Sequence, residues 1–240
     1  MYRLIAARRK RAAPGNDLLS LFMAARDAET GESMDDRQLR DELLTMLRTG
    51  HSTLREAVLW CWYLLASNPE AERRFYDEID TVLGGRSPSF EDLPRLAYTL
   101  QVIHESMRLY PPAWVFVRAA IHDDEIGGYH VPAGAMVVLC PYVTHRHPDF
   151  WEDPETFDPD RFSPERSAAR PKFAYYPFGG GPRLCIGNHF AFMEAQIILA
   201  MTAQRFRLEL GREHKVRMAL FVSLMAHDLW LRMIPRGPNA

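Results

Sequence analysis

The residue with the clearest chemical potential is a cysteine in a glycine-rich loop. Cys185 lies in the stretch FGGGPRLCIG, which runs from Phe178 to Gly187. Glycines let the backbone turn tightly and let a flat ligand approach it closely. The pattern after the loop predicts a helix over residues 187–205, and the amino end of a helix favours a negatively charged thiolate. The loop therefore predicts a cysteine thiolate that can bind a metal.

The alternative interpretation is a glycine-rich turn with a buried structural cysteine, which is the more common role of a lone cysteine. Two neighbours favour the ligand. Arg183 places a cation two residues away that can pair with an acidic group of a cofactor, and Phe178 offers an apolar shield for the sulfur. The other cysteines, Cys61 and Cys140, lie in unrelated settings. They form no disulfide framework, which is typical of a protein from a reducing compartment.

A second chemically suggestive group lies 80 residues earlier. Glu105 and Arg108 are spaced i, i+3, so they share one face of a predicted helix over residues 95–109. Such pairs are common on solvated helices and carry little weight alone. This pair lies inside an apolar helix that Tyr110, Pro111 and Pro112 close, which favours a buried ion pair.

The elements that would position these residues are mostly helical. Apolar residues recur at three- and four-residue spacing from Asp35 without a proline until Pro69, which predicts a helix of about 30 residues. Two shorter helices are expected before it, over residues 1–11 and 16–29, separated by residues 13–16. The expected strands are short. They cover residues 115–118, 125–127, 136–139, 206–210, 220–225 and 229–233, with ordered loops over 141–180. The predicted fold class is mainly α with small β-sheets.

Composition limits the classes of function. The 240 residues are 47% hydrophobic and 25% charged with a formal net charge of −2, which is typical of a globular protein and gives no basis for nucleic-acid binding. No apolar run is long enough to span a bilayer, and the basic start up to Arg11 does not look like a secretory signal. These features predict a cytoplasmic protein without a membrane segment.

The cysteine loop resembles the haem-binding signature F-x-x-G-x-R-x-C-x-G of the cytochrome P450 family. The resemblance implies the cytochrome P450 fold of a bacterial-type soluble member, with haem b (heme, iron protoporphyrin IX) as cofactor and Cys185 as the axial thiolate to the haem iron. The matching positions, which the resemblance implies to be cofactor-binding, are Phe178, Gly181, Arg183, Cys185 and Gly187.

Two further elements are similar to the family. Residues 157–162 resemble its P-E-R-F element, with Asp160 in place of glutamate. By that resemblance, Arg161 joins Glu105 and Arg108 in a buried structural ion network. Arg118 occupies the position whose arginine pairs with a haem propionate, although a surface arginine in a strand is the alternative. Trp114, Val115 and Phe116 would then face the substrate, unless they only pack.

The long helix resembles the family's oxygen-activating helix, whose motif is A/G-G-x-D/E-T-T/S. Residues 49–54 read TGHSTL, so Gly50 and Thr53 match. Thr53 would hold iron-bound oxygen and relay protons, and Gly50 would open the helix for dioxygen or water. Thr49 stands where the family has a small apolar residue over the haem, and Ser52 replaces the carboxylate. Arg48 either recruits an acidic substrate at the pocket edge or points towards solvent.

The resemblance begins partway through the family's fold. We therefore expect residues 1–240 to be the C-terminal portion of a single cytochrome P450 domain, from the distal helix to the C-terminus, with the N-terminal portion absent. On this basis the chain alone is expected to expose apolar surface and to bind haem poorly.

The leading functional hypothesis is a haem-thiolate monooxygenase that inserts one oxygen atom from O2 into a small apolar organic substrate. Its electrons would come from a ferredoxin, a flavodoxin or an NADPH-dependent reductase. Two alternatives stay open. One is a peroxide-dependent peroxygenase or a haem-thiolate dehydratase or isomerase, and the other is an inactive truncated fragment or a partner-binding module.

Overall fold

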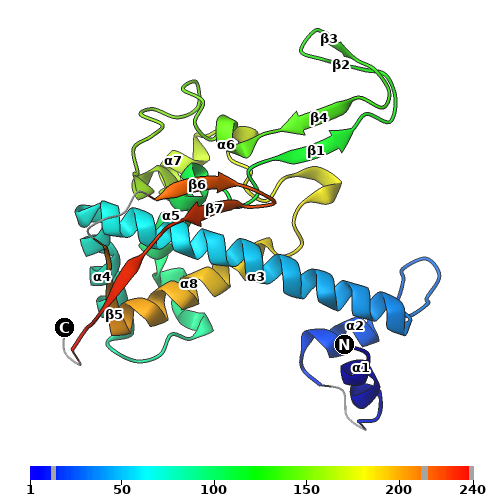
Figure 1. The fold of residues 1–240 in the computed structure, drawn as a ribbon, viewed down its shortest axis with the longest axis horizontal. Helices are drawn as coiled ribbons and strands as arrows, with labels where there is room; N and C mark the ends of the chain where they lie inside the picture. Colours follow the sequence, from blue (N-terminus) through cyan, green and yellow to red (C-terminus); the bar gives the residue numbers. More distant parts are fainter. Residues whose placement is uncertain (12–14, 212–215, 238–240) are drawn as a thin grey trace. The chain divides into compact units, whose positions relative to one another are not determined.

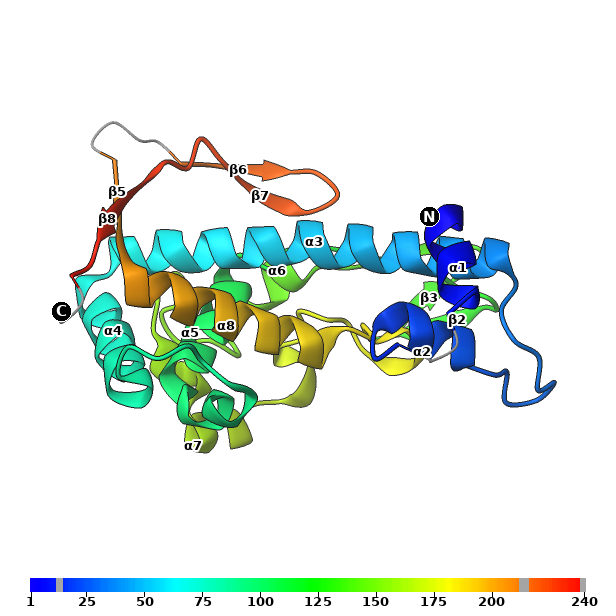
Figure 2. The same ribbon diagram turned by 90° about the horizontal axis from the view of Figure 1, so that it is seen from below.

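The computed structural model describes residues 1–11, 15–211 and 216–237, and it is mainly helical with small antiparallel sheets (Figure 1, Figure 2). The chain divides into two compact units, residues 1–52 and residues 53–240. Each unit is described by itself. Within the described residues, no helix is both long and apolar enough to span a membrane.

The first unit contains helices α1 (Tyr2–Arg9) and α2 (Leu18–Ala24) and the start of α3. Asp17 caps α2, because its carboxylate accepts the Ser20 backbone N–H at 3.0 Å. Helix α2 is shorter than the predicted 16–29, since the backbone is already extended at residue 25. Residues 13 and 14, which belong to the predicted separation between the first two helices, lie outside the described residues. A small apolar cluster holds the unit together: Ile5, Leu19, Leu39 and Leu43.

Helix α3 (Asp36–Ser67) is 32 residues long, so the predicted long helix is confirmed. Asn68 ends it, and Pro69 occupies the first position of α4 (Pro69–Leu83), where a missing N–H costs no hydrogen bond. Gly84 ends α4 with φ +55°, a left-handed conformation that glycine adopts at little cost.

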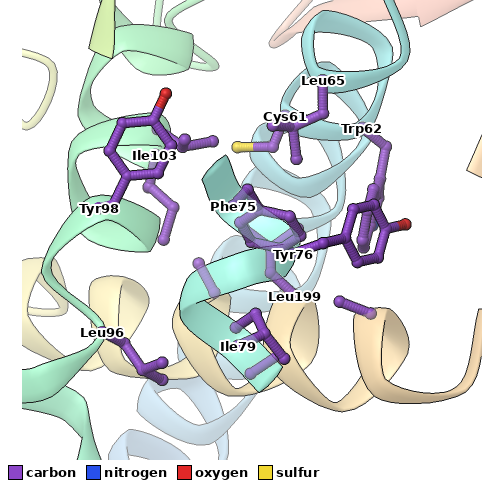
Figure 3. Packing of buried hydrophobic residues seen from close by; sticks show 14 of the residues in the cluster. Cys61, Trp62, Leu65, Phe75, Tyr76, Ile79, Leu96, Tyr98, Ile103 and Leu199 are labelled. Atoms are coloured by element: carbon purple, nitrogen blue, oxygen red, sulfur yellow. The ribbon is translucent and has the colours of Figure 1, made fainter. Parts of the chain in front are cut away.

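The core of the second unit lies where the last turns of α3 meet α4, α5 (Ala97–Leu109) and α8 (Asn188–Arg205), as Figure 3 shows. Phe75, Ile103 and Leu199 are fully buried there beside Cys61. Helix α8 contributes mostly small side chains to this core, which lets its backbone approach α4 and α5 closely. These buried helices form the base on which the cysteine loop sits.

The sheets are four two-stranded antiparallel pairs. They are β1 (Phe116–Ala119) with β4 (Met136–Leu139), β2 (Asp124–Ile126) with β3 (Tyr129–Val131), β5 (Phe206–Leu210) with β8 (Leu231–Pro235), and β6 (Arg217–Leu220) with β7 (Leu224–His227).

One strand prediction is wrong, and strand β3 was missed. The predicted strand over residues 220–225 is wrong, because residues 221–223 form the turn between β6 and β7. The apolar residues in this stretch resemble a short strand, although part of the stretch forms a hairpin turn. Strand β3 was not predicted, since residues 129–131 are too few to show an alternating pattern.

The remaining elements are short helices in the segments between the longer elements. They are η1 (Phe90–Arg95), α6 (Pro141–Thr144), η2 (Pro159–Phe162), α7 (Pro164–Ala168), η3 (Lys172–Ala174) and η4 (Gly181–Arg183). Five of them fall in residues 141–183, where loops were expected, and each is only three to five residues long.

Candidate active site

Backbone hydrogen bonds fold the cysteine loop back on itself. The Cys185 N–H donates to the Phe178 carbonyl at 3.1 Å, and the Leu184 N–H donates to the Gly181 carbonyl at 3.1 Å. Gly179 and Gly181 have φ values of +76° and +68°, which larger residues adopt only with strain. The loop is therefore a closed turn, and its glycines are required by its shape.

The thiol of Cys185 lies at the amino end of α8. Gly187 is the N-cap of this helix, and a Cβ atom built on Gly187 would be 3.9 Å from the Cys185 Sγ. Unpaired backbone N–H groups and the helix dipole stabilise negative charge at this end. Cys185 is a free, exposed cysteine, so its sulfur is accessible to a ligand.

Cys185 borders an apolar cavity of about 200 Å³. Thr53 on α3 and Phe116 on β1 border the same cavity, as does Phe178 from the loop. The remaining lining residues are Leu54, Ala57, Ile103, Met107, Pro112, Ala113, Pro177, Ala191, Phe192 and Ala195. The Thr53 hydroxyl and the Cys185 thiol are thus the two reactive side chains on an otherwise apolar wall.

The predicted distal residues fall in both units. Thr53 borders the cavity in the second unit, whereas Thr49 and Gly50 belong to the first. The Thr49 hydroxyl donates to the Thr45 carbonyl at 2.7 Å, and the Ser52 hydroxyl donates to the Arg48 carbonyl at 2.9 Å. Arg48 is exposed. The catalytic roles of Thr53, Gly50 and Thr49 stay predictions.

Arg118 lies on strand β1 on the same face as Phe116, because side chains two residues apart in a strand point the same way. Phe116 borders the cavity, so Arg118 is on the cavity side of the strand. Its Nη1 donates to the Val117 carbonyl at 2.9 Å. Arg183 is exposed in η4. The pairing of Arg118 and Arg183 with acidic groups of a cofactor stays a prediction.

Trp114 and Val115 are not among the residues that line the cavity in the described part of the chain. Of the three residues predicted to face the substrate, Phe116 lines it. Trp114 instead donates its indole N–H to the Phe221 carbonyl at 3.0 Å.

The structure brings Glu105, Arg108 and Arg161 together in one buried network. Arg108 makes two hydrogen bonds to the Glu105 carboxylate, at 2.7 and 2.8 Å, and both side chains are fully buried. The Arg161 Nε lies 3.4 Å from Glu105 Oε1. Burial raises the pKa of Glu105, while the two arginines oppose that rise. The arginines thus favour a charged Glu105 in this buried position.

Arg108 also fixes a long loop. Its Nη1 donates to the carbonyls of His145 at 2.9 Å and Pro154 at 2.7 Å, and its Nη2 donates to Thr156 at 3.1 Å. The Asp158 N–H donates to Glu105 at 2.9 Å. The ion pair therefore ties α5 to residues 145–158, which is a scaffolding role and leaves no donor for chemistry.

Two histidines, the fully buried His145 and the partly buried His104, belong to the same scaffold. The rings of His104 and Phe192 have centroids 4.4 Å apart, and Phe192 in turn packs edge-on against Phe178. Burial lowers the pKa of His104 to about 4 and that of His145 to about 3. Nothing local in the sequence indicated which aromatic rings would pack around the two histidines.

The donor set at the cavity suits one kind of metal group. In the described part of the chain, no cluster of three or more His, Cys, Asp or Glu side chains could hold a metal ion. Cys185 would therefore supply a single thiolate, and the remaining ligands would have to come from the cofactor itself. An apolar cavity, a glycine-rich approach and one thiolate fit a planar metal macrocycle such as haem.

Comparison with known proteins agrees with this geometry. The family model described as "Cytochrome P450" matches residues 1–228. A crystal structure of the cytochrome P450DA heme domain superposes with a TM-score of 0.94 at 33% sequence identity, covering 99% of this chain and 52% of that chain.

Several curated relatives are bacterial. Cyclooctatin synthase from Streptomyces melanosporofaciens is 45% identical over 219 residues, which is 91% of this chain and 47% of that protein. Pentalenene oxygenase from Streptomyces avermitilis is 38% identical over 237 residues, which is 98% of this chain and 53% of that protein. The chain spans about half the length of the curated relatives it matches.

Proposed function

The chain belongs to the cytochrome P450 family, and from this premise we propose that it forms the cysteine-bearing part of a haem-thiolate monooxygenase. The observation that carries the proposal is the placement of Cys185 and Thr53 on one apolar cavity. A thiolate on one element and a hydroxyl on another are the two groups that such chemistry needs from this part of the protein.

Cys185 would hold the iron of haem b, and Phe178 and the loop glycines would shape the surface around the sulfur. Gly181 and Gly187 keep the backbone close to the ligand, while Arg118 and Arg183 would pair with its acidic groups. Bound through a thiolate, haem supplies reductive activation of dioxygen, because the sulfur donates electron density that favours cleavage of the O–O bond.

Protons would reach the cavity through hydroxyl groups. Thr53 is the hydroxyl side chain on the cavity wall. Ser52 stands where the family has a carboxylate, and its hydroxyl donates to the Arg48 carbonyl. A serine can pass a proton along a chain of water but cannot supply one as a carboxylic acid does. We therefore expect proton delivery to depend on Thr53 and ordered water.

The substrate would be a small apolar organic molecule, since the cavity offers almost no polar side chains. The relatives' names point the same way: one is a cyclooctat-9-en-7-ol 5-monooxygenase and one is a pentalenene oxygenase. A cyclic alkene or alkenol is therefore the substrate class to test first. We place the reaction in the cytoplasm, with electrons from a ferredoxin, a flavodoxin or an NADPH-dependent reductase.

The replacement of the carboxylate by Ser52 keeps a peroxide-dependent peroxygenase as a second candidate. The two functions differ in their oxidant. We expect the haem-loaded protein, given pentalenene, NADPH, a ferredoxin and its reductase under ¹⁸O2, to form a product that carries one ¹⁸O atom. A Thr53→Ala variant should form much less of it. Product that appears only with hydrogen peroxide would overturn the monooxygenase in favour of the peroxygenase, and haem binding without product from either oxidant would favour an inactive fragment.

A further inference from the structure

The β6–β7 hairpin is attached to two different walls of the cavity through one residue. The Leu224 N–H donates to the Pro112 carbonyl at 3.0 Å. The Leu224 carbonyl accepts the indole N–H of Trp60 at 3.0 Å. Leu224 is fully buried, so neither hydrogen bond competes with solvent. Its backbone therefore links the segment after α5 (residues 110–115) to helix α3.

Helix α3 and the segment after α5 each make a second hydrogen bond to the hairpin. On the side of the segment after α5, the Trp114 indole N–H donates to the Phe221 carbonyl at 3.0 Å. On the side of α3, Glu56 accepts the Ala226 N–H at 3.3 Å. Each wall therefore holds the hairpin at two points. Figure 2 shows the hairpin running alongside α3.

The two attached segments both line the cavity. Thr53, Leu54 and Ala57 of α3 line it, as do Pro112 and Ala113. Trp60 also stacks on Tyr110, with ring centroids 3.8 Å apart and planes at 8°, just before the second segment begins. Both of these walls are thus attached to the same hairpin.

The hairpin depends on these attachments for its own order. Strands β6 and β7 pair only with each other in the described part of the chain, and an isolated two-stranded hairpin is marginally stable. The side chains at its turn do not anchor it, because Phe221 is 74% exposed and Val222 is 84% exposed. The Trp114 indole therefore holds the turn at Phe221, where the exposed side chains do not anchor it.

From this arrangement we propose that the β6–β7 hairpin is a brace that sets the width of the cavity, with Trp60 and Trp114 as its positioning residues. Neither side chain needs to touch a ligand for this role. Loss of one indole donor would leave one wall with a single attachment, loosen it relative to the other wall and broaden the range of ligand sizes that the cavity accepts. The inference rests on the proposed function in one respect, namely that the cavity receives the substrate.

The test compares Trp114→Phe, which keeps the ring and removes the donor, with Tyr76→Phe as a matched control. Tyr76 also donates to a backbone carbonyl, that of Phe206 at 3.1 Å, but it joins α4 to β5 and does not line the cavity. Trp114 is only partly buried, so its variant should fold. Hydrogen–deuterium exchange of residues 220–224 is measured in both variants and the parent protein.

We expect exchange at the Leu224 amide to rise about tenfold in Trp114→Phe and to stay unchanged in Tyr76→Phe, because one hydrogen bond contributes roughly a factor of ten to local opening. Equal exchange in the two variants would overturn the brace. This measurement needs no cofactor, so its result is independent of the proposed function.

The second readout is ligand-size discrimination in the haem-loaded proteins. N-alkylimidazoles from ethyl to octyl are titrated, and binding is followed by the absorption change of the iron. The ratio of the dissociation constants for the octyl and ethyl probes should shift at least about fivefold in Trp114→Phe and not in the control. An unchanged ratio would contradict a role in cavity width. Absence of a thiolate absorption band in the parent protein would instead count against the proposed function, and the exchange data would still decide the brace.

Discussion

Arg108 illustrates how a charge is kept inside this protein. Its guanidinium is fully buried and has the Glu105 carboxylate and three backbone carbonyls as partners. Moving such a group out of water is costly, and only a complete set of partners offsets that cost. Arg161 is held less completely, because its buried Nε makes no hydrogen bond to any described group. The network is therefore anchored by Arg108 and extended by Arg161.

Replacing Arg108 by methionine should lower the free energy of unfolding by about 3–5 kcal/mol, because Glu105 would be left buried without its main partner. Urea unfolding at pH 7 measures the change. Arg73→Ala serves as the control, since the Arg73–Asp77 pair is exposed on α4 and should contribute less than about 1 kcal/mol. Equal losses in the two variants would show that burial of the pair does not matter.

At the scale of residues, the sequence indicated the groups whose type and spacing are informative by themselves. Cys185 lies in a loop with a distinctive glycine pattern, and Glu105 and Arg108 are one helical turn apart. The partners of Trp114 and Trp60 were not predictable, because they lie 107 and 164 residues away and are backbone carbonyls that any residue could supply. The same holds for His104, whose burial depends on aromatic rings from three other segments.

At the scale of elements, helix α3 carries the most unusual feature. Glycine in the middle of a helix lowers its stability, and the hydroxyls of Thr45, Thr49 and Ser52 all donate to carbonyls four residues earlier, which tends to bend a helix. These features gather around Gly50. The stretch that the family resemblance assigns to oxygen chemistry is therefore also the stretch where the long helix is intrinsically weakest.

Gly50→Ala should raise the free energy of unfolding by about 1 kcal/mol, because alanine is the better helix former and an added Cβ meets no described atom within 4 Å. Gly84→Ala is a matched variant for which we expect a stability change of the opposite sign. It also has open space, but its φ of +55° should make the variant about 1 kcal/mol less stable. Thermal unfolding of both variants checks the pair. A loss of stability in Gly50→Ala would mean that the glycine is needed for packing.

Element prediction succeeded where periodicity was long and failed where it was short. Helix α3 shows its apolar spacing over 32 residues, so its existence was clear from the sequence. Residues 220–225 offered one brief apolar run, and the hairpin turn at 221–223 looks the same as a strand at that length. The short helices between residues 141 and 183 escaped prediction because each spans only three to five residues, too few for an apolar period to appear.

At the scale of the whole molecule, stability is linked to pH through buried neutral histidines. Burial lowers the pKa of His104 to about 4 and that of His145 to about 3. In the unfolded chain both would titrate near 6.5. Below that pH the unfolded state binds protons that the folded state cannot, so the free energy of unfolding must fall as the pH falls.

The parent protein should therefore lose roughly 1–2 kcal/mol of stability per buried histidine between pH 7 and pH 5. His104→Phe, which keeps an aromatic ring among Phe162, Tyr175 and Phe192, should lose less over the same range. Urea unfolding at the two pH values measures both proteins, and identical slopes would contradict the role of His104.

The account depends most directly on Cys185 as the thiolate ligand of haem iron. The decisive measurement is the carbon monoxide difference spectrum of the reduced, haem-loaded protein, compared with Cys185→Ala and with Cys140→Ser, whose thiol is also free but does not line the cavity. We predict the strongly red-shifted band of a thiolate complex in the parent and in Cys140→Ser, and its loss in Cys185→Ala. A band that survives in Cys185→Ala, or that is absent from the haem-loaded parent, would contradict the central claim.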